Sequence, residues 1–572
     1  MFRNRTLAIA LVGSLLMWAA QPPLALGWLG WIAPIPWLVV ARKNELAGRR
    51  PYRALWFAAF VYWMAALHWL RLPHPAVYLG WFALSAYLAI YLPFFVGLTR
   101  VAVRQLGTPF WLAAPIVWTG LELARAHVMT GFMMGSLAHT QYRSPLVIQI
   151  GDLFGEYGVD FVMILVTAAI VDCGFRLRDR SFKHRTARYI LAPLLPAAIL
   201  LAATLIYGDS KLRAANSENH QSSISDQQRP SAVRIALIQG NSAADWKADL
   251  AKQQAIMTEY VDLSTQAIAK AAALDNRPIH LLVWPETMFR NSLRSFEPGF
   301  KMPADAPNTI EQVAASGPRD LASLAARLGV PILVGVDRLV FLAGDGTHNT
   351  NPDFHLYNSS VLVDPAGKIL GTYDKFHLVM FGEYVPFSKY LPFLDRMTSI
   401  TGAAEAGIGP VALESNGVSF APSICYETVI PHVIRHQVDT LDASGQRPDV
   451  LVNLTNDAWY WGSSELDMHL ACDVFRAVET RTPLVIAANG GISAWIDHTG
   501  RIRAESPRQQ PDVILADVEL NRTPSPSVYV RIGDLFALVC LTACVILAII
   551  GWKSKRNKTK INHNDTKYTT NF

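Results

Sequence analysis

Residues 357–375 read YNSSVLVDPAGKILGTYDK, and this stretch decides the fold of the central part of the chain. Its two halves are rich in β-branched and aromatic residues, which are typical of strands. The Asp-Pro-Ala-Gly sequence between them is typical of a turn. The stretch therefore predicts a β-hairpin.

Strand-like and helix-like segments alternate on both sides of this hairpin. Residues 248–273 and 318–329 have apolar positions at helical spacing. The other strand-like segments are short apolar runs that end in turn residues: 233–241, 280–286, 331–339, 418–427, 449–457, 483–502 and 512–520. Alternating strands and helices, together with a hairpin, predict an α/β sandwich with mixed sheets.

The rest of the chain has the composition of a membrane protein. Of the 572 residues, 51% are hydrophobic and only 17% are charged, and the mean hydropathy is +0.22. Soluble domains average about 25% charged residues. The apolar content excludes a disordered chain, and five Cys in so long a sequence exclude a disulfide scaffold.

Eight apolar segments approach the length of about 20 residues that a membrane-spanning helix needs. They are residues 7–20, 25–41, 54–71, 76–98, 109–125, 159–175, 189–207 and 533–552. A cleaved signal peptide is the alternative for the first segment, and it is disfavoured because further apolar runs follow at once.

These segments predict four parts of the chain. Residues 1–208 form a transmembrane domain of about seven helices, and residues 229–530 form a water-soluble domain after a polar linker. Residues 531–552 form a C-terminal transmembrane helix, and residues 553–572 form a basic tail.

The distribution of Lys and Arg indicates the orientation in the membrane. Basic residues gather at the N-terminus, after the second, fourth and sixth spans, and in the tail, whereas the three short connections on the other side hold only Arg71 and Arg143. Because basic connections stay in the cytoplasm, the soluble domain is predicted to lie outside it. The tail is expected to contact anionic membrane lipids, and no nucleic-acid partner is predicted.

Three strand-like segments of the soluble domain end on reactive side chains: Glu286, Lys375 and Cys425. Taken singly, each has an ordinary role as a solvated carboxylate, a surface charge or a small core residue. Together they suit acyl transfer. A carboxylate can take the proton of a thiol, and an ammonium can lower the pKa of the thiol and stabilise an oxyanion.

The remaining cysteines and histidines do not indicate a metal site. No Cys and His spacing of the known zinc patterns occurs, so no metal and no cofactor are predicted. Cys472, the only other Cys of the soluble domain, lies in a helical stretch and is expected to pack in the core. A disulfide between Cys425 and Cys472 stays open as an alternative, because the domain is expected to face an oxidising space.

The reactive residues and their flanking motifs resemble those of the carbon-nitrogen hydrolase, or nitrilase, superfamily, whose Glu-Lys-Cys triad matches Glu286, Lys375 and Cys425 in order and context. The motifs YDKFHLVMFGEYVPF, ICYE and NLTNDAWY, with the flanking spans, resemble the apolipoprotein N-acyltransferase family of Gram-negative bacteria over nearly the whole chain. The first motif is highly specific, whereas WPET and ICYE are shared by many nitrilase relatives.

The resemblance implies a nitrilase-like αββα domain in the periplasm, held by helices of the inner membrane. It also implies the reaction. An acyl chain moves from a phospholipid donor, through a thioester on Cys425 in a ping-pong cycle, to the α-amine of the diacylglyceryl-modified N-terminal cysteine of an apolipoprotein. In this reaction Glu286 is the base and Lys375 stabilises the oxyanion.

Three further residues match positions that the family treats as part of its active site: Glu383, Tyr426 and Glu427. Glu383 is expected to orient Lys375 or to assist proton transfer, and Glu427 to support the pocket. Ion pairs that hold loops are the alternative for both glutamates. The apolar stretches 376–387 and 390–394 are expected either to dip into the membrane or to pack inward.

The sequence departs from the family pattern at a few places. Met380 stands where the family usually has Pro, and Trp461 is inserted before Gly462. Trp246 lies near a position where the family has a Trp, but the spacing differs and no role is assigned to it. Two other functions stay open: a membrane-tethered nitrilase-type amidase, which resolves the thioester with water, and a ligand-binding receptor or transporter with an inactive triad.

Overall fold

The structure is a computed structural model that describes residues 5–75, 77–178, 186–221, 231–244, 249–302, 306–343, 353–386, 404–521 and 526–568. Trp246 and the apolar stretch 390–394 lie outside the described residues. The chain divides into two compact units. The helical unit comprises Met1–His68, Trp81–Asp209 and Asp534–Phe572, and the sandwich unit comprises Trp69–Gly80 and Ser210–Gly533.

The sandwich unit contains a seven-stranded mixed sheet with the order β13-β1-β2-β4-β5-β6, and β3 pairs with β4. β1, β2 and β4 are parallel neighbours, whereas β13, β5 and β6 join by antiparallel pairing. The predicted hairpin is β5 and β6. The strands are β1 Ala232–Gln239, β2 Leu281–Val283, β3 Phe289–Phe296, β4 Ile332–Phe341, β5 Phe354–Val363, β6 Ile369–Asp374 and β13 Asp512–Glu519.

A second, six-stranded sheet has the order β12-β11-β10-β9-β8-β7. Its central strands β8, β9 and β10 are parallel, and the outer pairs are antiparallel. The central strands are buried along their whole length, as parallel strands covered on both faces are. The strands are β7 Leu413–Ser415, β8 Val418–Ile424, β9 Val450–Asn456, β10 Leu484–Asn489, β11 Ala494–Ile496 and β12 Ile502–Glu505.

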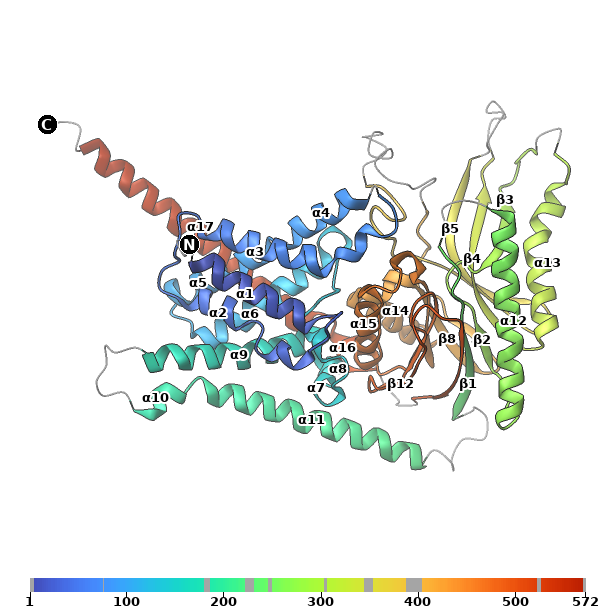
Figure 1. Ribbon diagram of the computed structural model, residues 1–572, viewed down its shortest axis with the longest axis horizontal. Coiled ribbons are helices and arrows are strands. Elements are labelled where there is room, and N and C mark those ends of the chain that lie inside the picture. Colours follow the sequence, from blue (N-terminus) through green and yellow to red (C-terminus); the bar gives the residue numbers. More distant parts are fainter. Residues whose placement is uncertain are drawn as a thin grey trace. The chain divides into compact units, whose positions relative to one another are not determined.

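Helices cover the outer face of each sheet, which makes four layers (Figure 1). α12 and α13 pack on the seven-stranded sheet, and α14 and α15 pack on the six-stranded sheet. A second apolar cluster fills the space between the two sheets. The helices are α12 Leu250–Leu274, α13 Ile310–Leu328, α14 Pro431–Ala443 and α15 Glu465–Thr480. This confirms the predicted αββα sandwich with mixed sheets.

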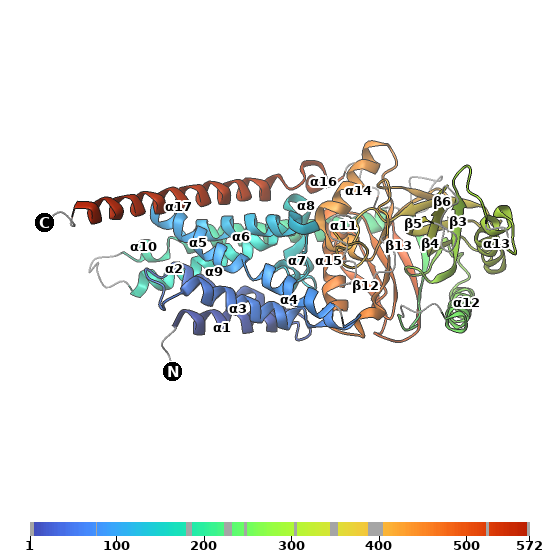
Figure 2. The same cartoon turned by 90° about the horizontal axis from the view of Figure 1, so that it is seen from above.

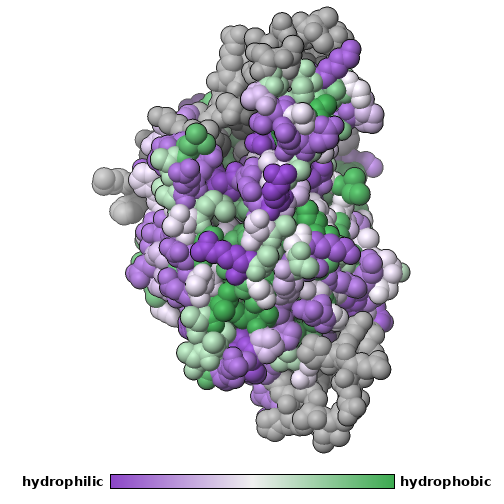
Figure 3. Space-filling view, turned by 90° about the vertical axis from the view of Figure 1, so that its right-hand side faces the viewer, coloured by the Kyte–Doolittle hydropathy of each residue, from purple (hydrophilic) through white to green (hydrophobic). Residues whose placement is uncertain are grey.

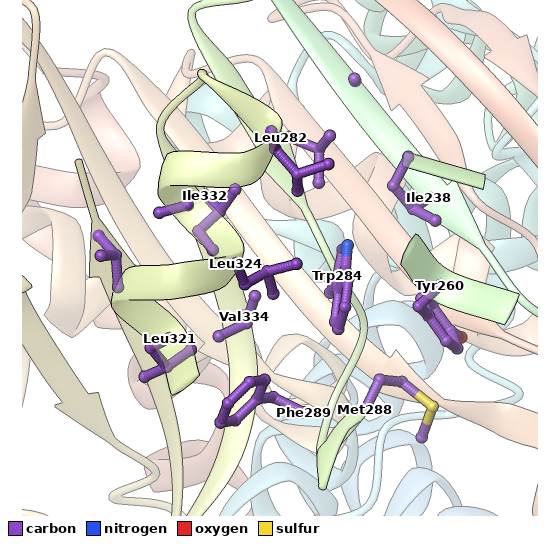
Figure 4. Packing of buried hydrophobic residues seen from close by; sticks show 14 of the residues in the cluster. Ile238, Tyr260, Leu282, Trp284, Met288, Phe289, Leu321, Leu324, Ile332 and Val334 are labelled. Carbon is purple, nitrogen blue, oxygen red and sulfur yellow. The ribbon is translucent and has the colours of Figure 1, made fainter. Parts of the chain in front are cut away.

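The core under α12 anchors the end of β2, which leads to Glu286. Figure 4 shows the fully buried ring of Trp284 between Tyr260 of α12 and side chains of α13 and the sheet. The indole N–H of Trp284 donates to Ser264 Oγ at 2.8 Å, which satisfies its one polar atom. The residue two positions before Glu286 is thus held by packing and by a hydrogen bond.

The outer helices of the sandwich unit are amphipathic. α13 begins with a capping box, in which Thr309 accepts from the N–H of Gln312, and ends at Gly329, whose φ of +67° suits a left-handed helix cap. The face that α12 and α13 form is mainly hydrophilic, with small hydrophobic patches (Figure 3). Burial of one face and hydration of the other is the usual state of helices that cover a sheet.

The helical unit consists mainly of apolar helices connected by short loops. The longer ones are α1 Arg5–Ala20, α2 Ile35–Arg42, α3 Pro51–Ala66, α4 Val77–Leu88, α5 Tyr91–Gln105, α6 Phe110–His127, α9 Glu156–Arg178, α11 Leu194–Gln221 and α17 Leu535–Tyr568. α11 continues past residue 207 into the predicted linker, because residues 211–215 are good helix formers.

Four helices among the described residues are long and apolar enough to cross a membrane: Val77–Gln105, Glu156–Arg178, Leu194–Ser217 and Leu535–Arg556. The predicted number of eight spans is therefore not confirmed. The span predicted at residues 25–41 is divided between a 3₁₀ helix, Gly27–Trp31, and α2. Pro34 lies between the two pieces and has no N–H with which to continue a helix.

The helices of this unit pack closely and pair their charged residues. α17 runs alongside α5 and α6 (Figure 2). Gly120 of α6 allows the close approach, since a Cβ there would lie 2.6 Å from Cys540 O. The buried carboxylate of Asp172 accepts from Arg42 Nε at 2.8 Å and from Arg176 Nε at 3.0 Å. Charges among apolar helices are compensated in this way.

Candidate functional site

Three strand ends at one edge of the sandwich carry the reactive side chains. β2 ends shortly before Glu286, β6 ends directly before Lys375, and β8 ends directly before Cys425. β6 runs in the same direction as β2 and β4, because two antiparallel pairings separate it from β4. Side chains that follow strands of one direction meet at the same edge of a sheet. The structure thus brings together residues that are far apart in the chain.

The carboxylate of Glu286 is buried and held by two donors. Asn358 Nδ2 donates to Oε1 at 2.6 Å, and the main-chain N–H of Asn456 donates to Oε2 at 3.0 Å. Asn358 belongs to the seven-stranded sheet and Asn456 to the other, so the carboxylate connects the two sheets. Its Oε1 lies 3.9 Å from Nζ of Lys375. Glu286 is therefore fixed in one orientation with a cation beside it.

Lys375 is the buried cation of the site, with 1% of its surface exposed. Its Nζ donates to Glu383 Oε1 at 2.8 Å, and the other oxygen of Glu383 accepts from the N–H of Val379 at 2.8 Å. Burial by itself lowers the pKa of Lys375, but Glu383, Glu286 and Cys425 raise it above its usual value. The side chain is therefore an ammonium at neutral pH.

Cys425 lies at a sharp turn between β8 and the 3₁₀ helix Cys425–Val429. Its φ is +52°, and Thr287, next to Glu286, has a φ of +53°. A non-glycine residue in this left-handed region costs about 1–3 kcal/mol and persists only where its surroundings hold it. Strain of this kind is common at functional sites, and here it falls at or beside two of the three reactive residues.

Glu427 fastens the turn at Cys425 to the turn at Lys375. Its two oxygens accept four hydrogen bonds, one from the residue before Cys425, one from β6 and two from the residues after Lys375. The donors are Ile424 N at 2.7 Å, Tyr373 Oη at 2.7 Å, Phe376 N at 3.0 Å and His377 N at 3.1 Å. This buried carboxylate thereby sets the spacing between the thiol and the ammonium.

The ring of Tyr426 stacks on the imidazole of His377, with 6.4 Å between the ring centroids and 10° between the planes. His377 follows Lys375 closely, so this contact links the same two turns as Glu427 does. The structure thus places Glu383, Tyr426 and Glu427 in one site with the three reactive residues.

The pKa values of the Cys425 thiol and of the Glu286 carboxyl group are both raised. Burial raises the pKa of the Cys425 thiol well above its usual value, Glu286 raises it further, and Lys375 opposes both. Burial also raises the pKa of Glu286, which Lys375 lowers and Glu383 raises. The resting cysteine is therefore a thiol. A carboxylate with a raised pKa is a better base for it than an ordinary one.

A cavity of about 240 Å³ opens beside Glu286. Its wall combines polar and apolar groups and includes Ser242, Arg290, Asn358, Asn456, Trp459 and Asn489. The carboxylate of Glu286 therefore faces a space in which a reactant can sit.

Three asparagines of this wall were not predicted from the sequence. Asn358 donates to both Glu286 and Glu383, and Asn489 Nδ2 donates to Asn456 Oδ1 at 2.8 Å. Asn456 and Asn489 each end a strand that is buried along its whole length, and Asn358 lies within β5. A polar side chain in a buried strand needs a hydrogen-bond partner, and this is the signal that could have found Asn456 and Asn489.

One group of side chains among the described residues is close enough to be considered as a metal site: Asp457, Glu465 and His469, with one atom of each within 4.8 Å of the others. Its contacts are those of a buried ion-pair cluster. His469 Nδ1 lies 3.5 Å from Asp457 Oδ1 and 3.9 Å from Glu465 Oε1, and Thr455 Oγ1 donates to Asp457 Oδ1 at 2.6 Å. We therefore do not assign metal ligands here.

The chain matches known proteins over most of its length. Residues 13–169 match the family model described as apolipoprotein N-acyltransferase N-terminal domain, and residues 234–525 match the carbon-nitrogen hydrolase model. An apolipoprotein N-acyltransferase of Rhodopirellula baltica is 32% identical, covering 91% of this chain and 92% of the relative. One of Geobacter metallireducens is also 32% identical, covering 92% of each.

Two similar solved structures each cover about half of this chain. A mutant amidase of the nitrilase superfamily from Nesterenkonia has 19% identity and a TM-score of 0.34, covering 53% of this chain and 95% of its own. A carbon-nitrogen hydrolase from Helicobacter pylori has 13% identity and a TM-score of 0.35, covering 53% and 94%.

The two sheets, their outer helices and the family match over residues 234–525 define a protein of the carbon-nitrogen hydrolase class. This class includes hydrolases as well as acyltransferases, and the N-terminal helices distinguish them here. With its match over residues 13–169 and relatives at 32% identity along nearly the full length, the chain belongs to the apolipoprotein N-acyltransferase family. The predicted class of enzyme, an acyltransferase, is confirmed.

Gly335 of β4 passes close to the main chain of Glu286. A Cβ at Gly335 would lie 2.4 Å from Pro285 O, 2.5 Å from Thr287 N and 2.6 Å from Glu286 Cα. Gly335→Ala is therefore expected to displace Glu286 and to lower the initial rate of acyl transfer at least about tenfold, since a shift of about 1 Å can cost about a hundredfold. Gly174→Ala is the control, because a Cβ there meets nothing within 4 Å. Unchanged activity of Gly335→Ala would contradict this role.

Proposed function

We propose that Cys425 carries an acyl chain between two substrates. A phospholipid donates the chain, and the α-amine of the diacylglyceryl-modified N-terminal cysteine of an apolipoprotein receives it. Membership of the apolipoprotein N-acyltransferase family supports the lipoprotein acceptor. The observation that carries the proposal is that Glu427 ties the turn of Cys425 to the turn of Lys375, whose ammonium lies 3.9 Å from the Glu286 carboxylate.

In the first half-reaction the sulfur of Cys425 attacks the ester carbonyl of the phospholipid while Glu286 takes the thiol proton. Negative charge develops on the carbonyl oxygen, and the ammonium of Lys375 stabilises it. When the ester C–O bond breaks, Glu286 passes the proton to the leaving alkoxide. A lysophospholipid departs, and the acyl chain remains on the sulfur as a thioester.

In the second half-reaction the incoming amine attacks the thioester carbonyl. Glu286 accepts a proton from the amine nitrogen, and Lys375 again faces the oxyanion. When the C–S bond breaks, the sulfur of Cys425 takes the proton from Glu286, and the product is an amide. Both halves use the same groups, so the cycle returns the enzyme to its starting state.

The other three residues are assigned to positioning. Glu383 keeps Lys375 charged and oriented through the 2.8 Å bond between them. Glu427 holds the main chain on both sides of the site, which supports the role in the pocket expected for it. Tyr426 stacks on His377 and so links the turn at Cys425 to the turn at Lys375.

Substrates with fatty acyl chains favour a membrane location for this site. Burial of such a chain in lipid is worth about 0.8 kcal/mol per methylene, so donor and acceptor both stay in the bilayer. We propose that residues 1–208 and 531–552 span the inner membrane with about eight helices. We further propose that residues 229–530 face the periplasm and that the basic tail, residues 553–572, stays in the cytoplasm near anionic lipid.

A reporter enzyme inserted after residue 231 tests this orientation. The distribution of Lys and Arg predicts that an alkaline phosphatase, which is active only outside the cytoplasm, will be active at this position. The same reporter fused after residue 568 should be inactive. The reverse pattern would overturn the orientation.

Hydrolysis of a small amide by the same site is the weaker alternative. Nitrilase-type amidases share the carbon-nitrogen hydrolase domain, but the match of residues 13–169 is to the N-terminal domain of the acyltransferases. The two functions differ in the group that resolves the thioester, which is water in an amidase and an amine in an acyltransferase.

Mass spectrometry tests the proposal. The purified full-length protein is incubated with a phospholipid of known acyl composition and digested, and the peptide that contains Cys425 is analysed. One added fatty acyl group that disappears when a diacylglyceryl peptide is supplied, with formation of the N-acyl peptide, is the expected result. If Cys425 stays unmodified after incubation with phospholipid alone, and the acylated peptide still forms once the diacylglyceryl peptide is added, the thioester route is overturned.

A further inference from the structure

A second cluster of charged side chains lies against the main chain of Cys425. It consists of His469, Glu465 and Asp473 of α15 and Asp457, which follows β9, and each is at most 3% exposed. None of them was predicted from the sequence, and none takes part in the steps described above. Charges are rarely buried so completely unless they serve a purpose that offsets the cost.

The contacts of His469 define what surrounds its two ring nitrogens. Its Nε2 lies 3.2 Å from the main-chain oxygen of Cys425, 3.1 Å from Thr428 Oγ1 and 3.4 Å from Asn453 Nδ2. Its Nδ1 lies 3.5 Å from Asp457 Oδ1 and 3.9 Å from Glu465 Oε1. A carbonyl oxygen and an ionised carboxylate only accept hydrogen bonds, so each ring nitrogen faces an acceptor. Only the imidazolium form donates to both.

The charges around His469 favour this form. Burial by itself lowers the pKa of His469, but Asp473, Asp457 and Glu465 outweigh it and raise the pKa to about 10. The ring is therefore positively charged throughout the neutral range.

The main chain of Cys425, which His469 contacts, has a strained conformation. Cys425 has a φ of +52°, and its main-chain oxygen lies 3.2 Å from His469 Nε2 of α15 and accepts from Thr428 Oγ1 at 3.4 Å. Cys425 stands where β8 passes into the 3₁₀ helix, so its oxygen is free of the sheet ladder. A side-chain donor at this oxygen resists rotation of the peptide unit, and such rotation would move the sulfur.

We propose that His469 is a positioning residue for the nucleophile: its Nε2–H holds the carbonyl group of Cys425 in the left-handed turn, and its positive charge favours the thiolate as it forms. This inference rests on the proposed role of Cys425. His469 touches no reacting atom and acts only through the residue that carries the sulfur.

Without His469, the carboxylates that disfavour a thiolate at Cys425 would outnumber the cations that favour it. Glu286 and Asp457 both raise the pKa of the Cys425 thiol, whereas Lys375 lowers it. Lys375 is also engaged with Glu383. His469 is a second cation, on the side of the Cys425 main chain. Its pairing with Asp457 offsets the charge of this carboxylate, which would otherwise disfavour the thiolate.

Alkylation of Cys425 by iodoacetamide tests the proposal without any lipid substrate. The thiolate displaces iodide from the reagent, so the dependence of the rate on pH reports the pKa of the thiol. The full-length protein in detergent is labelled from pH 7 to pH 9, below the raised pKa of the thiol, and the Cys425 peptide is quantified by mass spectrometry. His469→Gln keeps a donor of similar reach and removes the charge. We expect about tenfold slower labelling of this variant across the range, which corresponds to a rise of about one unit in the pKa of the thiol.

The control is His436→Gln, at an exposed histidine of α14, and its profile should match that of the unaltered protein. A folded His469→Gln variant with an unchanged profile would overturn the proposal. If that variant does not fold, Asp473→Asn decides, because it leaves the bond from His469 to Cys425 in place and lowers the pKa of His469. In Asp473→Asn, His469 loses its charge at a lower pH than in the unaltered protein, and above that pH Cys425 should be labelled more slowly. Identical rate profiles of the two proteins would contradict the proposal.

This experiment separates the inference from the proposed function. If Cys425 is alkylated with the expected shift but never carries an acyl group, the positioning role stands and the thioester route fails. If the acyl group forms on Cys425 in both the unaltered protein and His469→Gln at the same rate and with the same pH profile, the thioester route stands and the positioning role fails.

Discussion

Cys425→Ala is expected to abolish acyl transfer and to leave no acyl group on the protein. The methyl side chain of alanine has no lone pair with which to attack an ester, so the first half-reaction cannot begin. Loss of a nucleophile typically lowers turnover by far more than about a thousandfold. The measurement is the rate at which a diacylglyceryl peptide gains a fatty acyl group from phospholipid, with the mass of the protein recorded in parallel.

Two further variants serve as controls for Cys425→Ala. Cys472→Ala makes the same change at a buried cysteine of α15 and should retain activity. Cys425→Ser keeps the shape of the side chain and should be nearly inert, because an alkoxide is much harder to form than a thiolate. More than about one per cent of normal activity in Cys425→Ala, with the protein folded, would contradict the assignment of the nucleophile.

Glu286→Gln is expected to slow formation of the acyl-enzyme by about a hundred- to ten-thousandfold, the usual contribution of a positioned base. The amide keeps the shape of the side chain and can accept the hydrogen bond from the N–H of Asn456. It cannot take the proton of Cys425. Single-turnover labelling of the enzyme with a phospholipid that carries a radioactive acyl chain measures this step directly.

The dependence of the same step on pH adds an independent check. Glu286 works as a base only when it is ionised, and its burial raises its pKa above the ordinary value of a glutamate. Activity should therefore fall as the pH decreases through this raised pKa, at a higher pH than an exposed glutamate would give. Glu286→Gln should lack this acidic decline. Glu414→Gln, at an exposed position of β7, should keep both the rate and the decline.

Much of the fold follows from local sequence patterns. The hairpin at residues 357–375 forms because β-branched residues flank a turn closed by Gly367, whose φ is +85°. Most apolar strands of the sandwich lie where they were predicted. The helix predicted at residues 318–329 begins earlier, at Ile310, and the segment 483–502 is divided between β10 and β11, while β3 and α14 were not predicted. The number of membrane spans was less predictable, because apolar composition does not reveal where a helix breaks, as it does at Pro34 between two shorter pieces.

Glu286, Lys375 and Cys425 were predicted from the sequence because each follows a strand and belongs to a motif of contiguous residues. Their hydrogen-bond partners were not predicted. Asn358 contacts Glu286 across 72 positions of the chain, and Asn456 does so across 170. No local pattern specifies a contact between residues so far apart. It arises only when the pairing of two sheets brings their strand ends together.

The sequence by itself indicated most strands of the sandwich, the apolar nature of the N-terminal helices and the chemical identity of the reactive groups, since these depend on residue type and short-range spacing. The tertiary structure alone decided that Glu427 joins the two turns, that Glu286 connects the two sheets and that His469 supports Cys425. The physical reason is that hydrogen bonds and ion pairs depend on position and angle to within a fraction of an ångström, and packing of the whole core sets these.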